Sequence, residues 1–345
     1  MSIMARVIPR LSAIQLITGT LPLFSWTMTH SLAASPAHEL PFSAIGTVAA
    51  PQDLRRFIFK QVQQDKKRIF FMGEHHEQPR VLAAQLTMLD ELIVQARAES
   101  RAVILVLEQF NVGQQGMLSR FSGGSTALPP ETDHYEEVEK KAADQLLRDY
   151  EEDGTEGFTL PHYMPLLIHA RACGVRICGG FPPRAWARIV AKEGVDTLRQ
   201  RHAKELQDMK FDRWGDLECS PHHAAFLRSM MSGKAPQPDA VKDEERLRGI
   251  HAAQAFKDAV LAHTIDREVE ESKGEALIMV VSGSGHCEYG FGGPERVRTV
   301  AREEMCVLVS KSVQESTIWK GAAWGGDAEE HDRVLADAVY CYDQV

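Results

Sequence analysis

The chain has 345 residues, of which 44% are hydrophobic and 25% charged, and its formal net charge is -9. These values are typical of a globular protein with one large domain or two small ones. The acidic balance, with no basic stripe that carries interleaved aromatic residues, argues against nucleic acid as a partner. The six cysteines form no CxxC pair, which argues against a four-cysteine zinc module or a thioredoxin-type motif.

The first 38 residues differ in composition from the rest of the chain. They contain no acid, and Arg6 and Arg10 are their only charges other than histidine. An apolar stretch, Leu11–Met28, follows the arginines, and small residues fill Ser31–Ala37. This order predicts a targeting segment over residues 1–38, so we expect export from the cytosol. A secretory or periplasmic destination and an organellar one (chloroplast or mitochondrion) both stay open. After this segment no run approaches the ~20 apolar residues of an integral membrane span.

Short apolar runs alternate with helical patterns along the remaining chain. This alternation predicts an α/β fold, with a mostly parallel central sheet, helices on both faces and an added helical subregion at about 195–272. A single domain over 45–312, an acidic excursion at about 122–160 and a C-terminal tail over 313–345 complete the expected organisation. The predicted strands are 69–72, 102–108, 175–178, 276–281 and 307–309, and the predicted helices include 50–64, a helix opening at 79, 163–173, 184–193 and 242–272.

A turn rich in ionisable groups follows the first predicted strand of this domain. The apolar run Ile69–Met72 stops at Gly73, the residues Glu74–Glu77 read Glu-His-His-Glu, and Pro79 opens a helical pattern. In an open parallel sheet such a turn lies at the carboxyl end of a strand, where these folds bind ligands. A solvated polar turn is the competing interpretation, and four adjacent ionisable residues directly after a buried strand weigh against it.

Ionisable residues also lie at, or just beyond, the ends of other predicted strands. Glu74 and His76 follow the first strand, Glu108 ends the second and His286 follows a later one. Parallel strands place such residues on one edge of the sheet, where they could act as acid and base or, through His76 and His286, bind a divalent metal. Taken singly, Glu108 could be a helix cap or salt-bridge partner, and His286 a structural histidine. HExxH is absent, which argues against a zincin-type metalloprotease.

Five motifs in this order carry a resemblance to a known family. They are GEHHE at 73–77, the strand-ending Glu108, Phe181-Pro-Pro-Arg184, Gln254-Ala-Phe-Lys-Asp258 and GSGH at 283–286. Together they resemble the ChaN-like haem-binding uptake family of the Tiki superfamily. The resemblance implies an α/β fold with its site on one sheet edge, where Glu74, His76, Glu108 and His286 match the shared polar site and Arg184, Gln254 and Asp258 match supporting positions.

The resemblance implies a haem-binding protein linked to haem or iron uptake, with haem or another tetrapyrrole as partner and a homodimer left open. Haem needs an apolar slot and an axial ligand. The candidates for that ligand are Tyr163, His222, His223, Met230 and Met231.

A second hypothesis follows from wider relatives, which include metalloproteases and erythromycin esterases. The strand-end residues would then form a metal-assisted or Glu/His acid–base hydrolase, in which Glu74 or Glu108 activates water. The sequence has no GxSxG elbow, so water would attack directly. Whether the chain is an enzyme stays open at this point.

Overall fold

The computed structural model describes residues 46–48, 50–123, 135–154, 156–211, 220–232, 244–301, 303–312 and 335–343. The expected targeting segment, 1–38, lies outside these residues and stays a prediction.

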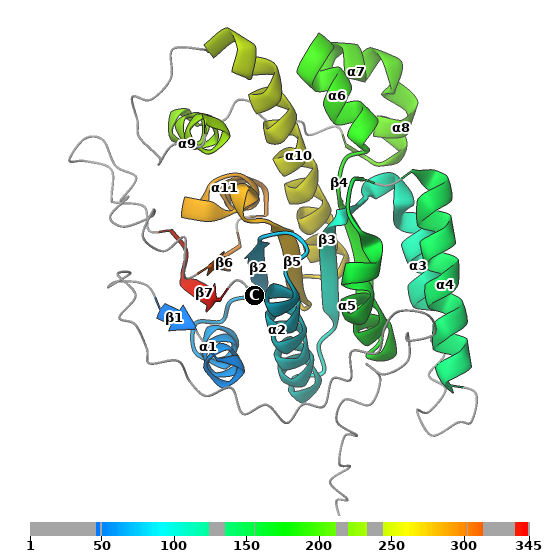
Figure 1. Ribbon diagram of the computed structural model, residues 1–345, viewed down its shortest axis with the longest axis vertical. Coiled ribbons are helices and arrows are strands. Elements are labelled where there is room, and N and C mark those ends of the chain that lie inside the picture. Colours follow the sequence, from blue (N-terminus) through cyan, green and yellow to red (C-terminus); the bar gives the residue numbers. More distant parts are fainter. Residues whose placement is uncertain are drawn as a thin grey trace, which may run out of the picture.

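A seven-stranded sheet in which all neighbouring strands are parallel forms the centre of the molecule (Figure 1). Its order is β1-β7-β6-β2-β5-β3-β4. The predicted α/β class is confirmed. The strands are β1 Gly46–Val48, β2 Ile69–Glu74, β3 Val103–Asn111, β4 Arg176–Phe181, β5 Leu277–Gly283, β6 Met305–Ser312 and β7 Ala338–Tyr342.

The central strands are apolar throughout because both faces of the sheet are covered. Along β2, Phe70 and Met72 point into one hydrophobic cluster, whereas Ile69 and Phe71 point into a second cluster on the opposite face. Successive side chains of a strand point to opposite faces, so a sheet buried on both sides requires apolar residues at consecutive positions.

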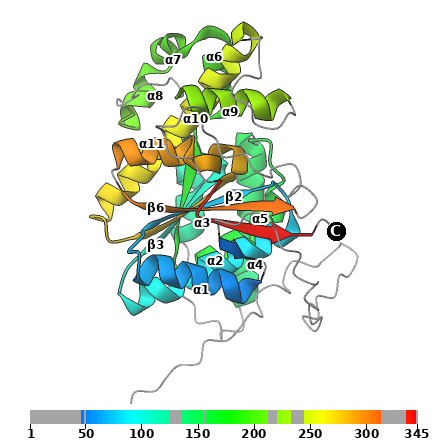
Figure 2. The same cartoon turned by 90° about the vertical axis from the view of Figure 1, so that its left-hand side faces the viewer.

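Helices cover both faces of the sheet, and Figure 2 shows these layers edge-on. Helices α1 to α5 pack on one face, while α9, α10 and α11 pack on the other. Helices α6, α7 and α8 form a smaller cluster against α10; α7, α8 and α10 fall within the expected range of about 195–272, whereas α6 precedes it. Among the described residues, no helix is both long and apolar enough to cross a membrane. The helices are α1 Pro51–Gln63, α2 Pro79–Ala98, α3 Gln115–Gly123, α4 Tyr135–Asp153, α5 Leu160–Ala172, α6 Arg184–Glu193, α7 Val195–Arg201, α8 Ala203–Asp208, α9 Pro221–Ser232, α10 Glu244–Glu271 and α11 Gly293–Val300.

Two boundaries differ from the sequence-based expectation. Glu108 does not end its strand: β3 continues to Asn111, although its pairing with β5 stops at Leu107. The sheet also continues beyond residue 312, because β7 pairs with β6 and lies within the expected C-terminal tail. The other strands were assigned because apolar runs alternate with helical patterns. The five-residue run of β7 was not assigned as part of such an alternation, so the sequence did not mark it as a strand of this sheet.

The connections after β2 and β5 leave the sheet in opposite directions. The chain after β2 enters α2, which packs on one face, and the chain after β5 leads to α11 on the other face. Adjacent parallel strands with this property form a switch point, where the carboxyl ends of the strands border a crevice. The turns that follow β2 and β5 therefore face each other across this point.

The importance of the buried strands can be tested with two phenylalanines. Phe70→Ala removes a fully buried ring from β2, whereas Phe59→Ala removes a ring from α1 that is 46% exposed. We expect the first change to lower the free energy of unfolding by roughly 3–5 kcal/mol and the second by less than about 1 kcal/mol. Urea unfolding of both variants measures this, and equal losses would contradict the assignment of Phe70 to the core.

Candidate functional site

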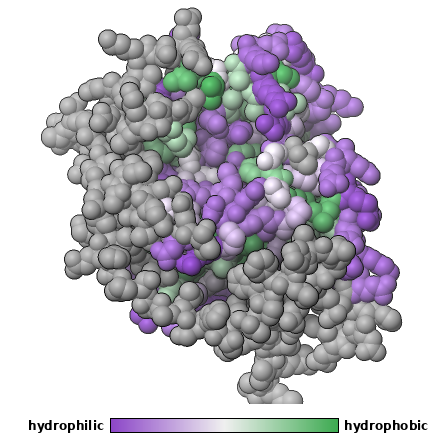
Figure 3. All heavy atoms as spheres, in the orientation of Figure 1, coloured by the Kyte–Doolittle hydropathy of each residue, from purple (hydrophilic) through white to green (hydrophobic). Residues whose placement is uncertain are grey.

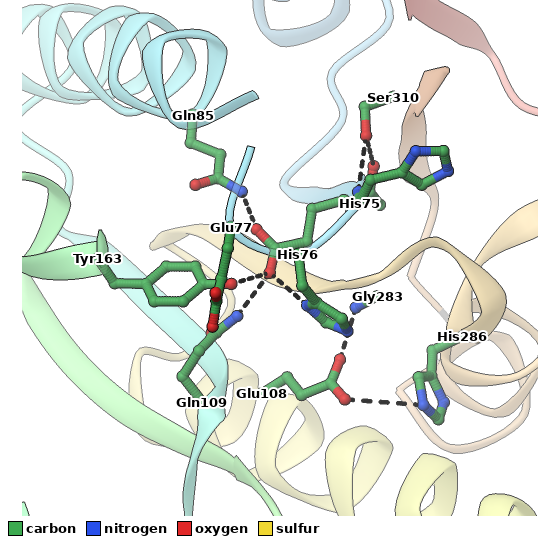
Figure 4. Close-up of polar contacts among 12 residues, drawn as sticks. His75, His76, Glu77, Gln85, Glu108, Gln109, Tyr163, Gly283, His286 and Ser310 are labelled. Atoms are coloured by element: carbon green, nitrogen blue, oxygen red, sulfur yellow. Dashed lines mark hydrogen bonds and ion pairs between the residues drawn. The ribbon is translucent and has the colours of Figure 1, made fainter. Parts of the chain in front are cut away.

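The carboxylate of Glu74 lies at the end of β2, and only 3% of the residue is exposed. Its Oε1 accepts hydrogen bonds from Gln109 Nε2 at 2.7 Å and from the Tyr163 hydroxyl at 2.7 Å, and lies 2.8 Å from His76 Nδ1. Its Oε2 accepts a hydrogen bond from Gln85 (Figure 4). These donors compensate the buried carboxylate for the water that it loses.

His76 is the exposed member of this network. Its side chain is 42% exposed, and Nδ1 is occupied by Glu74, so Nε2 is the ring nitrogen that faces away from the carboxylate. Partial burial opposes protonation, but the hydrogen bond to Glu74 and the nearby charge of Glu108 outweigh it and raise the pKa of His76. The buried carboxylate thus fixes the orientation of the imidazole.

Glu108 lies where β3 separates from β5. Its Oε2 accepts a hydrogen bond of 2.5 Å from the backbone N–H of Gly283, the last residue of β5. A Cβ atom at Gly283 would lie 3.0 Å from His76 Nε2 and 3.4 Å from Glu108 Oε2. The missing side chain at this position lets the imidazole and the second carboxylate both approach the end of β5.

His286 is held by the carboxylate of Asp258. Its Nδ1 lies 2.7 Å from Oδ1 of Asp258, which comes from α10 and is fully buried. Its Nε2 lies 3.9 Å from Glu108 Oε1. The site therefore contains two imidazoles, each backed by a buried carboxylate, with Glu108 between the strand ends that carry them.

The structure brings together all four residues that were expected at the strand ends. Glu74 is hydrogen-bonded to His76, and Glu108 and Asp258 flank His286, at 3.9 Å and 2.7 Å. The two groups meet at Gly283, where a Cβ atom would lie within 3.4 Å of both His76 and Glu108. The neighbouring His75 points away from both groups, and its Nδ1 lies 2.7 Å from the Tyr342 hydroxyl of β7. Figure 4 shows the two adjacent histidines on opposite sides of their turn.

Tyr163 supports Glu74 in this arrangement. Its side chain is fully buried, and burial, followed by the charge of Glu74, raises the pKa of its hydroxyl. The phenol is therefore neutral and is committed to the Glu74 carboxylate. Binding of iron by Tyr163 would require this bond to break.

The other predicted ligands lie on α9. His223 is buried, its ring is stacked on Phe291 with centroids 5.6 Å apart, and burial lowers its pKa to about 4. Its Nε2 has no hydrogen-bond partner among the described residues. Met230 is exposed and lies against Gly285 of the turn that carries His286. The side chains of His222 and Met231 lie outside the described residues.

Two further predicted residues lie nearby without joining the hydrogen-bonded group. Arg184 is the first residue of α6, and its guanidinium lies next to Gly157. Gln254 lies on α10, one turn before Asp258, and its Oε1 has no partner in the described part of the chain.

Sequence reasoning missed the two glutamines that bind Glu74. Gln109 directly follows Glu108 after the apolar run Val103–Leu107, and this pair of polar residues was the available signal. Gln85 lies on the buried face of α2, where a helical pattern alone gives no reason to select it.

A metal site is not apparent in the described residues. They contain no group of three or more His, Cys, Asp or Glu side chains that could hold a metal ion. The predicted ligands His76 and His286 have their Nδ1 atoms occupied by carboxylates, so Nε2 is the ring nitrogen that each could offer to a metal.

Comparisons with known proteins identify the family of the chain and relatives of its fold. The family model described as haem-binding uptake, Tiki superfamily, ChaN, matches residues 61–297. The chain belongs to this family. Its fold is similar to that of a ChaN structure from Campylobacter jejuni described as binding heme cofacially, with 12% identity, a TM-score of 0.52, and coverage of 81% of this chain and 90% of that one. A mutant erythromycin esterase in its open conformation has 15% identity, a TM-score of 0.40, and coverage of 76% of this chain and 75% of that one. No curated protein sequence matches the chain.

The low pKa of His223 predicts a loss of stability in mild acid. A pKa of about 4 in the folded chain, against ~6.5 for an unfolded histidine, means that the unfolded state binds more protons between these values. Stability is therefore present above pH ~6.5 and falls as the pH decreases toward 4, by roughly 3 kcal/mol for this group.

His223→Phe keeps a ring on Phe291 and removes the titrating group. We expect the difference in unfolding free energy between pH 7 and pH 4 to be about 3 kcal/mol smaller in this variant than in the wild type. Urea unfolding at both pH values measures the difference. Parallel pH dependences would show that His223 is not buried in its neutral form.

Proposed function

We propose that this chain binds haem, with His76 Nε2 as the axial ligand. Membership in a haem-binding family carries the proposal. Imidazole nitrogen is a common axial ligand of haem iron, and a ligand histidine usually donates its other N–H to a carboxylate or carbonyl. Among the residues of the group, His76 has this arrangement and also an exposed side chain.

Two features around His76 support this assignment. The Phe158 ring lies edge-on to the imidazole, with centroids 5.0 Å apart. The carboxylates of Glu74 and Glu108 lie close enough to raise the pKa of His76 in spite of its partial burial. Their negative charge also favours a cationic metal centre. Figure 3 shows that the described part of this side of the molecule presents mainly hydrophilic residues with hydrophobic ones among them. When bound, the haem would supply the iron chemistry, and the chain would hold and orient it.

A role in haem or iron uptake outside the cytosol extends this proposal. It is supported by the family's description and by the composition of residues 1–38. Sequencing the N-terminus of the mature protein checks the export step, since a secreted or imported form would begin near residue 39.

Hemin titration of residues 39–345 tests the ligand. We expect a saturable Soret shift in the wild type, and a loss of at least about tenfold in affinity in His76→Ala, because one iron–ligand bond is removed. His75→Ala is the matched control, because it changes the same residue type in the same turn but on the side that faces Tyr342. Equal affinities in all three proteins would remove His76 as the ligand.

One observation favours a second function, acid–base hydrolysis. Two carboxylate-backed imidazoles flank Glu108, which resembles the arrangement that positions a general base and a general acid. His286 lies 3.9 Å from Glu108, a separation that one bound water or substrate oxygen could bridge.

A panel of activated esters tests this second function. We expect any hydrolysis to fall roughly 10²–10⁴-fold in His286→Ala and in Glu108→Gln, as for the loss of a general acid or base. His202→Ala, a change at a partly exposed histidine between α7 and α8, serves as the control. Full activity in both site variants would eliminate the hypothesis.

A further inference from the structure

Residues 156–159, here called the strap, form the end of the acidic excursion, lead into α5 and pass beside the site. Phe158 of the strap contacts His76 edge-on, with ring centroids 5.0 Å apart and an interplanar angle of 68°. The same ring lies 6.4 Å from Tyr163. The last residues of the acidic excursion, for which the sequence offered no role, therefore contact the imidazole that we assign as haem ligand.

Hydrogen bonds at Glu156 fasten the start of the strap. Its Oε1 accepts a hydrogen bond of 2.7 Å from Asn111 Nδ2. Its Oε2 accepts one of 3.0 Å from the backbone N–H of Arg184, the first residue of α6. Its own N–H donates to the Tyr150 hydroxyl at 3.2 Å. The first residue of the strap is thus tied to β3, α4 and α6.

The backbone of Gly157 permits this path. Its φ of +96° lies in a region that side chains disfavour, and a Cβ atom there would lie 2.9 Å from Arg184 Nη1. The Arg184 guanidinium therefore covers the strap at the residue directly before Phe158.

The other end of the strap is fastened by the ligand turn itself. Glu77, next to His76, accepts a hydrogen bond of 2.9 Å from the backbone N–H of Thr159. Glu77 has a φ of +60°, which is uncommon for a residue other than glycine. Such strain persists only where surrounding interactions maintain it, and it is found preferentially at functional sites.

We propose that the strap keeps Phe158 against His76, so that Phe158 is a positioning residue for this imidazole and Glu77 is the latch that holds the strap closed. The Phe158 ring limits rotation of the imidazole and covers one side of it, which leaves a restricted approach to Nε2. The effect on haem rests on the proposed function, whereas the strap itself is a property of the chain without haem.

Carbethoxylation of His76 by diethyl pyrocarbonate in the haem-free protein tests the strap directly. We expect the rate at His76, measured by peptide mass spectrometry, to rise roughly two- to tenfold in Phe158→Ala, the range that corresponds to an aromatic contact. A similar rise is expected in Glu77→Ala, because the hydrogen bond to Thr159 is lost. Glu77→Gln keeps an acceptor oxygen, so its rate should stay within about twofold of the wild type.

Two controls accompany these variants. Phe59→Ala removes an exposed ring from α1 and should leave the rate at His76 unchanged. The rate at His202 reports on the reagent in every sample. Glu77 is exposed, so Glu77→Ala tests the strap even if Phe158→Ala does not fold. Unchanged rates at His76 in the folded variants would overturn the proposal.

Hemin titration of the same proteins separates this inference from the proposed function. Weaker hemin binding in Phe158→Ala and Glu77→Ala, by roughly two- to tenfold, with wild-type affinity in Glu77→Gln, supports positioning of the ligand. If the wild type takes up no hemin, the proposed function fails, while the carbethoxylation rates still decide whether the strap holds Phe158 on His76. Raised carbethoxylation with unaltered hemin affinity overturns the positioning role.

Discussion

The site depends on the buried carboxylate of Glu74. Glu74 ends the central strand β2 and is almost fully buried, so its charge has to be satisfied by protein groups alone. Donors for it come from α2, β3, α5 and the following turn. Since each donor lies on a different element, the position of one carboxylate couples the packing of the sheet to the orientation of His76.

A second carboxylate–imidazole pair repeats this device on the neighbouring strand. Asp258 comes from the helix that covers the opposite face of the sheet, and it holds His286 as Glu74 holds His76. The switch point between β2 and β5 explains why the two pairs meet: the turns after these strands diverge toward opposite faces and leave their polar residues at one edge of the sheet. Glu108 lies at the same edge, directly after the point where β3 stops pairing with β5.

This arrangement suits more than one function within a single family. An imidazole with one nitrogen bound to a carboxylate is a good iron ligand and also a good general base. The family match and the exposure of His76 favour haem, and the short distance between Glu108 and His286 favours proton transfer. The strap adds a structural reason to treat His76 as the residue on which binding centres, because a separate segment of the chain is fastened to the His76 turn and places Phe158 against the imidazole.

The sequence by itself determined the α/β class, the approximate positions of most strands and helices, and the residues at the strand ends. It could do so because these properties are local: strands buried on both sides are continuously apolar, and polar residues that follow them stand out from their surroundings. The glutamines that satisfy Glu74, the separation of His75 from His76, and the contact of Phe158 with His76 were decided only by the tertiary structure. Each of these joins segments far apart in the chain or depends on which way a side chain leaves a turn. The position of the final strand, β7, was also decided only by the tertiary structure, because its five residues join the sheet by pairing with β6.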